Sequence, residues 1–200
     1  MPLGAFKAAL MGTAGVSATG DVVLLSTQTA SDSASLDFTS GIDSTYGEYI
    51  FGFYNINPAT DDTDFQVNFS TDGSSWGMTK TATLFRAQHR ESEGGGTNYA
   101  LSYEGAFDLA QADTAQILAW DQGNGSDESL AGVMHLFSPS STTYVKHFYS
   151  RINAYNSGNW TFDIYCAGYI NDAANDVTGV QFEMASGNFD GTIKMWGVKQ

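Results

Sequence analysis

The clearest pattern in the chain is an alternation of large apolar residues with smaller or polar ones in two neighbouring segments. The alternating apolar residues are Tyr49, Phe51, Phe53, Phe65, Val67 and Phe69. A period of two places such side chains on one face of an extended chain. Between the segments, Pro58 lacks a backbone N–H, and the acidic run at 61–64 is too polar and too repulsive to bury. The pattern therefore predicts two antiparallel strands joined by a turn.

Short segments of the same kind recur along the rest of the chain, separated by glycine, asparagine, aspartate and serine. The further predicted strands are 22–26, 35–38, 81–87, 99–103, 117–120, 132–137, 144–154, 160–169, 177–184 and 193–198. A helical turn is predicted at 107–113, and the polar stretch 27–33 is predicted to separate two strands. About ten short strands without a helix-length period predict an all-β fold, namely an antiparallel two-sheet β-sandwich of the jelly-roll kind. A closed barrel is the alternative.

The first 20 residues differ from the rest of the chain. They are rich in alanine and are interrupted by four glycines, and the apolar stretch Ala8–Met11 is far shorter than a signal peptide requires. We therefore predict an N-terminal arm at 1–20, belonging to the mature chain, and a β-sandwich domain at 21–200. The apolar side chains through which the arm would attach to a neighbour are Phe6, Leu10 and Met11.

Charge and hydropathy exclude two classes of partner. The 200 residues carry 22 acidic and 8 basic side chains, and the net charge of −14 repels phosphate backbones and anionic lipid surfaces. No apolar run approaches the ~20 residues needed to span a bilayer. We expect neither nucleic-acid binding nor membrane insertion. The single cysteine, Cys166, lies among apolar strand residues, and we expect a buried, unreactive thiol.

Candidate catalytic groups are scattered. His89 lies beside Arg90, Glu91 and Glu93 in a glycine-rich segment, which is more typical of a solvated loop tip than of a site that holds catalytic geometry. A glycosidase would need two carboxyl groups that converge across a cleft. The candidates, none singled out by its neighbours, are Glu48, Glu104, Asp108, Asp163 and Glu183. We predict that the protein is not an enzyme, with a polysaccharide depolymerase as the minor alternative.

Two kinds of ligand remain open. Calcium prefers hard oxygen ligands on loops, which the acidic turn of Asp61, Asp62 and Asp64 offers without a spaced calcium-binding motif. The second acidic turn, at 121–128, is an equivalent candidate. A sugar could stack on Trp76 and Trp160, because both tryptophans adjoin turns and a ring with a polar edge suits a pyranose. No other cofactor is expected.

Three stretches resemble a family of uncharacterised virion-associated proteins of tailed bacteriophages, especially marine ones. They are STYGEYIFGFYNINPATDDTDFQVNFSTDG (Ser44–Gly73), FSPSSTTYVKHFYSRINAY (Phe137–Tyr155) and FEMASGNFDGTIKMWGVK (Phe182–Lys199). In that family a β-sandwich typically ends in a strand similar to GTIKxYGxK, and here Trp196 replaces the usual tyrosine. The resemblance extends from about Ala34 to the end of the chain, and it offers no catalytic residues to carry over.

The resemblance implies a non-enzymatic structural role on the surface of a phage particle, as a capsid decoration protein, a head fibre or a tail fibre. The arm at 1–20 would then contact other virion proteins, and the sandwich would assemble with itself, for which we expect a homotrimer by analogy. Contact with a host-surface glycan is a further expectation. A carbohydrate-binding β-sandwich attached to another assembly is the alternative.

Overall fold

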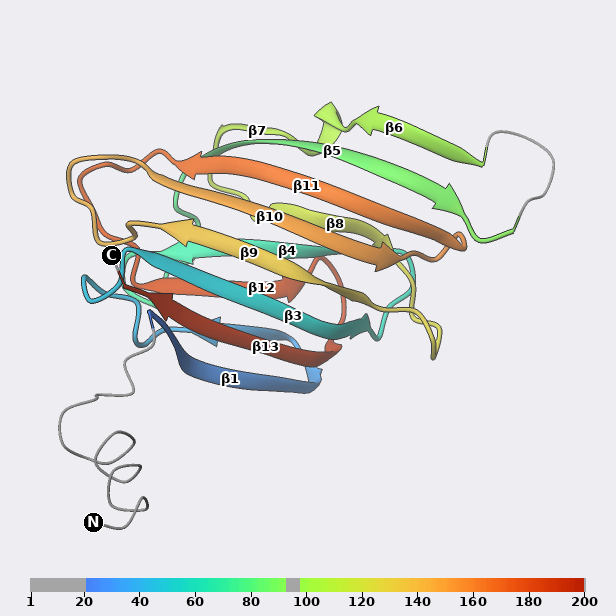
Figure 1. Ribbon diagram of the computed structural model, residues 1–200, viewed down its shortest axis with the longest axis horizontal. Helices are drawn as coiled ribbons and strands as arrows, with labels where there is room; N and C mark the ends of the chain where they lie inside the picture. Colours follow the sequence, from blue (N-terminus) through green and yellow to red (C-terminus); the bar gives the residue numbers. More distant parts are fainter. Residues whose placement is uncertain (1–20, 93–97, 200) are drawn as a thin grey trace, which may run out of the picture.

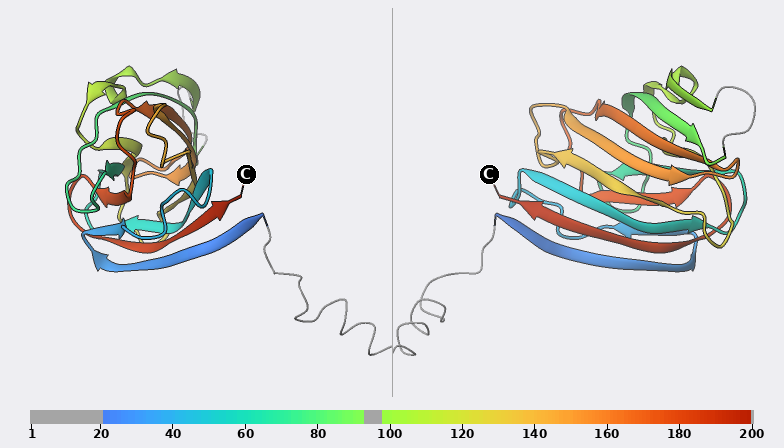
Figure 2. Two further views of the ribbon diagram at one scale, coloured as in Figure 1. Left: turned by 90° about the vertical axis from the view of Figure 1, so that its left-hand side faces the viewer. Right: turned by 45° about the vertical axis from the view of Figure 1, so that its right-hand side comes forward.

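The chain folds into two antiparallel β-sheets that pack face to face (Figure 1). This computed structural model describes residues 21–92 and 98–199. A broad sheet of nine strands lies in front in Figure 1, and a smaller sheet of four strands lies behind it. The two further views show the broad sheet as one continuous curved layer (Figure 2). Strands β1 and β6 lie at its two ends.

Each sheet has a definite spatial order of strands, in which neighbours are hydrogen-bonded to each other. The broad sheet contains β1 (Val22–Ser33), β13 (Phe189–Val198), β3 (Glu48–Pro58), β9 (Leu130–Phe137), β10 (Lys146–Tyr155), β11 (Trp160–Ile170), β5 (Lys80–Arg90) and β6 (Tyr99–Tyr103), with β7 (Leu109–Ala112) also paired to β5. The small sheet contains β2 (Ser35–Phe38), β12 (Gly179–Met184), β4 (Thr63–Ser70) and β8 (Gln116–Gln122). A 3₁₀ turn, η1, spans Gly105–Phe107.

The order of these strands is that of a jelly roll. The four strands β1-β13-β3-β9 face β2-β12-β4-β8. Strands of this set of eight that follow one another along the chain lie in opposite sheets, except β4 and β8, which pair within the small sheet. Two insertions, β5–β7 and β10–β11, add strands to one sheet only. The predicted two-sheet sandwich is therefore confirmed, and the chain does not form the alternative closed barrel. The insertions make one sheet wider than the other.

Aromatic rings from both sheets meet in the centre of the sandwich. The predicted alternation is confirmed, since Tyr49, Phe51 and Phe53 of β3 are all buried. The ring of Phe182 on β12 lies 5.3 Å from that of Phe51 and 5.1 Å from that of Phe53, between ring centroids. It also stacks on Phe65, its neighbour in the small sheet, at 5.9 Å and 14°. Such contacts add to the free energy gained by burying the rings themselves.

Two local predictions were wrong. The polar stretch 27–33 does not break the first strand, because β1 continues along β13 as far as the pairing of Ser33 with Phe189. Polar side chains are tolerated there because β1 is an edge strand. The helical turn at 107–113 is replaced by η1 and β7, and β7 pairs with β5 at Lys80–Ala112. Strand pairing supplies hydrogen bonds that a single helical turn cannot make for all its backbone groups.

Several sequence predictions concern residues outside the described part. The N-terminal arm, with Phe6, Leu10 and Met11, belongs to 1–20, and Glu93 belongs to 93–97. Within the described residues, Cys166 is buried as predicted, and desolvation raises the pKa of its thiol. None of the helices found there is long and apolar enough to cross a membrane.

The ring cluster leads to a test of the core. Phe182→Ala should lower the free energy of unfolding by about 3–5 kcal/mol, because it leaves a cavity among four neighbouring phenylalanines. Tyr144→Ala, at a side chain that is 74% exposed, is the matched control and should change stability little. Denaturant unfolding measures both. A loss at Phe182 no larger than that at Tyr144 would contradict this view of the core.

A candidate binding hollow on the broad sheet

Several large apolar side chains are exposed on the outer face of the broad sheet, where they take no part in the core. Near the β6 end these side chains are Phe85, Tyr99, Leu101, Tyr103 and Tyr149, which are between 43% and 78% exposed. They come from three strands, β5, β6 and β10, and all lie on the face turned away from the small sheet. Contiguous exposed apolar surface of this kind commonly marks an interaction site.

A hollow of about 620 Å³ lies on this face. Its central residues are small, because the register places Ala167 of β11 between Tyr149 of β10 and Thr83 of β5. Larger side chains surround them. The other lining residues include Tyr103, Asp108, Leu109, Ala110, Phe137, His147 and Tyr169. A concave site with aromatic walls and a few polar groups is typical of small-ligand binding, and this volume lies in the usual range of about 300–1,000 Å³.

Tyr149 is held in place on one side only. The ring of His135, its cross-strand partner on β9, stacks on it at 4.5 Å between centroids and 14° between planes, and the ring of Phe137 from the same strand stacks on it at 5.8 Å. His135 is fixed in turn by a 2.5 Å contact from its Nδ1 to Oε1 of Glu48. On the other side of Tyr149, Ala167 offers only a methyl group. One face of the Tyr149 ring is therefore supported, and the other borders the hollow.

The opposite wall carries a hydroxyl and a carboxylate. The Tyr103 hydroxyl donates a hydrogen bond to Oδ2 of Asp108, and this bond raises the pKa of Tyr103. Asp108 is fixed independently, because its Oδ1 accepts a hydrogen bond of 3.0 Å from the backbone N–H of Leu84. His147 and Tyr169 lie at one end of the hollow, with their rings 6.0 Å apart. The site therefore offers donors and acceptors around an apolar floor.

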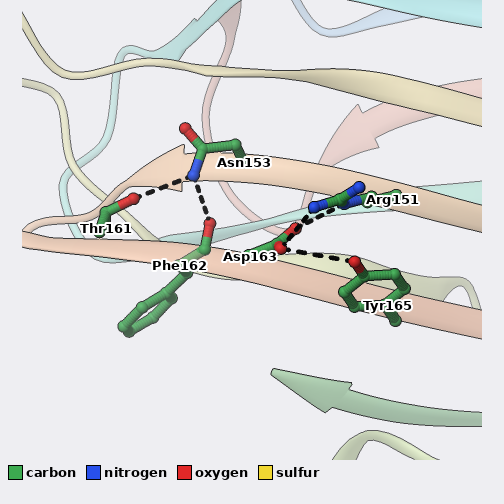
Figure 3. A network of polar contacts seen from close by, with 6 residues as sticks. All are labelled: Arg151, Asn153, Thr161, Phe162, Asp163 and Tyr165. Carbon is green, nitrogen blue, oxygen red and sulfur yellow. Dashed lines mark hydrogen bonds and ion pairs between the residues drawn. The ribbon is translucent and has the colours of Figure 1, made fainter. Parts of the chain in front are cut away.

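A network of polar contacts joins β10 and β11, two of the strands that line the hollow (Figure 3). Arg151 of β10 donates two hydrogen bonds, of 3.0 and 2.9 Å, to the carboxylate of Asp163 on β11. The guanidinium also lies 5.1 Å from the ring of Tyr165, whose other face is stacked on Phe85 at 4.8 Å. Both faces of Tyr165 are therefore covered, unlike those of Tyr149. Asn153 donates to Thr161 and to the carbonyl of Phe162, at 2.9 Å each.

The surface continues past the end of the hollow. A second depression, lined by Ser138, Ser141, Thr143, Tyr144, Val145 and Ala173, shares Phe137 and His147 with the first. Tyr144 is strongly exposed there, and the hydroxyl of Ser141 accepts the backbone N–H groups of Thr143 and Tyr144 at 3.3 and 3.0 Å. Because they share these two residues, the two depressions are continuous, which suits an extended ligand.

The two tryptophans predicted to stack on a sugar lie elsewhere. Trp160 projects to the inner face of the broad sheet, where it packs against the core and lies 5.6 Å from the Arg90 guanidinium. Trp76 is half-buried on the loop after β4 and packs close to Gly179. The structure does not bring these residues together with the hollow. The tyrosines that do line it were missed because strand register, which decides which side chains share a face, was not available from the sequence.

The predicted calcium residues have separate partners. Asp64 accepts the backbone N–H of Asp121 at 3.2 Å, and Asp61 accepts that of Asn124 at 3.3 Å. Asp62 contacts the hydroxyl of Ser157 at 3.4 Å. Across 21–92 and 98–199, no three or more His, Cys, Asp or Glu side chains are grouped as a metal site would require. Calcium binding at this turn stays a prediction.

The candidate catalytic carboxyl groups are dispersed. Glu48 contacts His135, Asp163 pairs with Arg151, and Glu104 lies 3.2 Å from Nε of Arg86. Glu183 belongs to the small sheet, and its pKa is raised by burial and by the nearby charge of Asp37. His89 is exposed, but it belongs to β5 and pairs with Thr161 and Tyr99, so the predicted loop begins two residues later than expected. This arrangement does not single out an acid–base pair.

Two buried lysines were not anticipated from the sequence. Lys80 of β5 and Lys146 of β10 are both fully buried, and each pairs with Ile170 of β11, one on either side. The Lys146 ammonium donates to the backbone carbonyls of Asp172 and Asn175. The Lys80 ammonium donates to the carbonyl of Met78 at 2.7 Å and to Oδ1 of Asn68 at 2.9 Å. Desolvation lowers the pKa of Lys80 to about 8.

Comparison with known proteins gives no relative for this chain, since no family model, curated protein or solved structure matches it.

The acidic turn generates a prediction about pH. Burial, with the charge of Asp62, raises the pKa of Asp64, so the folded state binds the extra proton more tightly than the unfolded chain. The stability that this proton supplies is present below the ordinary pKa of 3.8 and is lost as the pH rises through the raised value. Asp64→Asn should therefore be more stable than the wild type at neutral pH. Its stability should also fall less as the pH rises from 3.8 through the raised pKa of Asp64. Denaturant unfolding at a series of pH values measures this.

Asp61→Asn is the matched control, because Asp61 is exposed on the same turn and should change the pH profile little. A wild type that is more stable than Asp64→Asn at neutral pH would contradict the prediction. Repeating the series with added calcium tests the metal hypothesis, because a bound ion would raise the stability of the wild type above that of both variants.

Proposed function

We propose that this protein is a non-enzymatic structural protein exposed on the surface of a bacteriophage particle, and that it contacts carbohydrate through the hollow on its broad sheet. The observation that carries the binding role is the Tyr149 ring, which stacks on His135 and Phe137 and borders the hollow. A preorganised ring loses little freedom on binding, so more of the contact energy remains as affinity.

Carbohydrate suits the chemistry of the hollow. A pyranose has an apolar face that stacks on an aromatic ring and hydroxyls that need donors and acceptors at its edge. Tyr149 supplies the ring, while Tyr103, Asp108 and His147 supply polar groups around the floor. Hydrogen bonds within the protein hold Tyr103 and Asp108 in defined positions. An acidic protein of this charge would favour a neutral or cationic glycan over a strongly anionic one.

The virion role is supported by the sequence resemblance over Ser44–Gly73, Phe137–Tyr155 and Phe182–Lys199. The jelly roll is compatible with it, because a compact sandwich can be displayed on an assembly. The N-terminal arm would contact capsid or tail proteins, and the sandwich would form a homotrimer. A carbohydrate-binding module carried by another assembly is the second candidate, since the hollow would serve it equally well. Finding the chain on purified particles by mass spectrometry distinguishes the two.

Binding through the hollow can be tested by substitution. Tyr149→Ala should weaken binding to the glycans that the wild type retains on an array by about tenfold, because one stacked ring contributes on the order of 1 kcal/mol beyond its buried area. His135→Ala should weaken binding less, since it removes the support and leaves the ring. Titration calorimetry with an array hit measures both.

Tyr165→Ala is the matched control on the neighbouring strand, because both faces of Tyr165 are already covered within the protein. It should leave affinity almost unchanged, as should Trp76→Ala, which lies away from the hollow. Equal loss in Tyr149→Ala and Tyr165→Ala, or unchanged affinity in Tyr149→Ala, would reject the hollow as the site.

The oligomer is tested separately. Light scattering on the full chain should give three times the monomer mass of 21.4 kDa. A strict monomer that also binds neither phage particles nor host cells would count against the virion role, whatever the result for glycans.

A further inference from the structure

One buried contact between the two sheets joins a lysine amine to a side-chain amide, and these two groups can react with each other. Lys80 lies on β5 in the broad sheet and Asn68 on β4 in the small sheet, and they are 0% and 8% exposed. Nζ of Lys80 lies 2.9 Å from Oδ1 of Asn68. Because a C=O bond is ~1.2 Å long, Nζ is within about 4.1 Å of the amide carbon, close to the ~3–3.5 Å of a reactive approach.

We propose that Lys80 and Asn68 join through an isopeptide bond that links the two sheets. The neutral amine of Lys80 attacks Cγ of Asn68 to form the new N–C bond. The bond from Cγ to Nδ2 then breaks, and Nδ2 leaves as ammonia with the proton that Nζ gives up. One amide replaces another, so no oxidant, reductant or cofactor is required. If the reaction starts from the lysine ammonium, atoms and charge balance in the same way, and the product released is ammonium.

The surroundings favour each step of this exchange. Burial lowers the pKa of Lys80 to about 8, so a fraction of the amine is neutral near neutral pH. Oδ1 of Asn68 also accepts the backbone N–H of Phe69 at 3.0 Å, and this donor would stabilise the negative charge that develops on that oxygen. The carbonyl of Met78 orients Nζ at 2.7 Å. The Phe69 ring, 6.0 Å from Nζ, forms part of the apolar wall.

The proton can pass directly within the pair. Nζ already lies 2.9 Å from Oδ1 of the same amide group that carries Nδ2. The proton that Nζ loses on forming the new bond is therefore released next to the nitrogen that leaves. Among the described residues, no carboxylate forms an ion pair with Nζ, and the charge of Asp113 acts on the ammonium only from a distance.

Lys146 provides an internal comparison. Its side chain is also 0% exposed and lies on the other side of Ile170, but its ammonium donates only to the backbone carbonyls of Asp172 and Asn175. A backbone carbonyl at such a site offers no ammonia as a leaving group. Burial of a lysine is therefore common to both positions, and the side-chain amide partner is specific to Lys80.

Mass spectrometry of the denatured full chain tests the proposal. The wild type, incubated folded above the pKa of Lys80, should be lighter than its sequence by one ammonia per chain, and proteolysis should yield a branched peptide joining Lys80 to Asn68. Lys80→Met and Asn68→Ala should have the mass of their sequences, whereas Lys146→Met should keep the deficit.

Cyclisation at the Asn124–Gly125 sequence also releases ammonia, so the peptide map decides where a deficit arises. A deficit that maps to Asn124, or that persists in Lys80→Met, overturns the proposal. A folded wild type that keeps the full mass of its sequence overturns it as well. The wild-type mass and peptide map need no variant, so the result stands even where a substitution impairs folding.

Discussion

The structure depends on the contact between two sheets of unequal width. Phe182 from the small sheet packs among Phe51 and Phe53 of the broad sheet, and this ring cluster fixes the distance and the register between the layers. The small sheet covers only part of its partner, since two insertions widen the broad sheet from the four strands of the jelly roll to nine. The candidate hollow lies on the part of the broad sheet that the insertions add.

The widened sheet creates the candidate site. Strands β10, β11 and β5 lie beyond the original four, and their outward positions place small residues beside large aromatic ones. Hydrogen bonds and stacking within that face, including those of Asp163 with Arg151, hold its side chains without a ligand. The face is thus a surface of mutually supported side chains, and such preorganisation suits recognition more than chemistry that needs converging acids and bases.

At one end of the sandwich the same two layers enclose charged groups. Lys80 and Lys146 are buried there because their ammonium groups find carbonyl oxygens inside the protein, and an unpaired charge could not remain in such a place. The contact of Lys80 with Asn68 crosses from one sheet to the other. A covalent bond at that point would secure the layers where the ring cluster does not reach.

The sequence by itself determined the fold class and most strand positions, because alternation such as that of Tyr49, Phe51 and Phe53 depends only on which side chains avoid water. It also placed Cys166 in the core. It missed the continuation of β1, the strand β7 and the buried lysines, since each depends on a partner distant in the chain. For the sugar-stacking role it named Trp76 and Trp160, which do not line the hollow, because strand register was not known from the sequence. Local chemistry shows what a residue can do, but only the register between strands decides which residues meet.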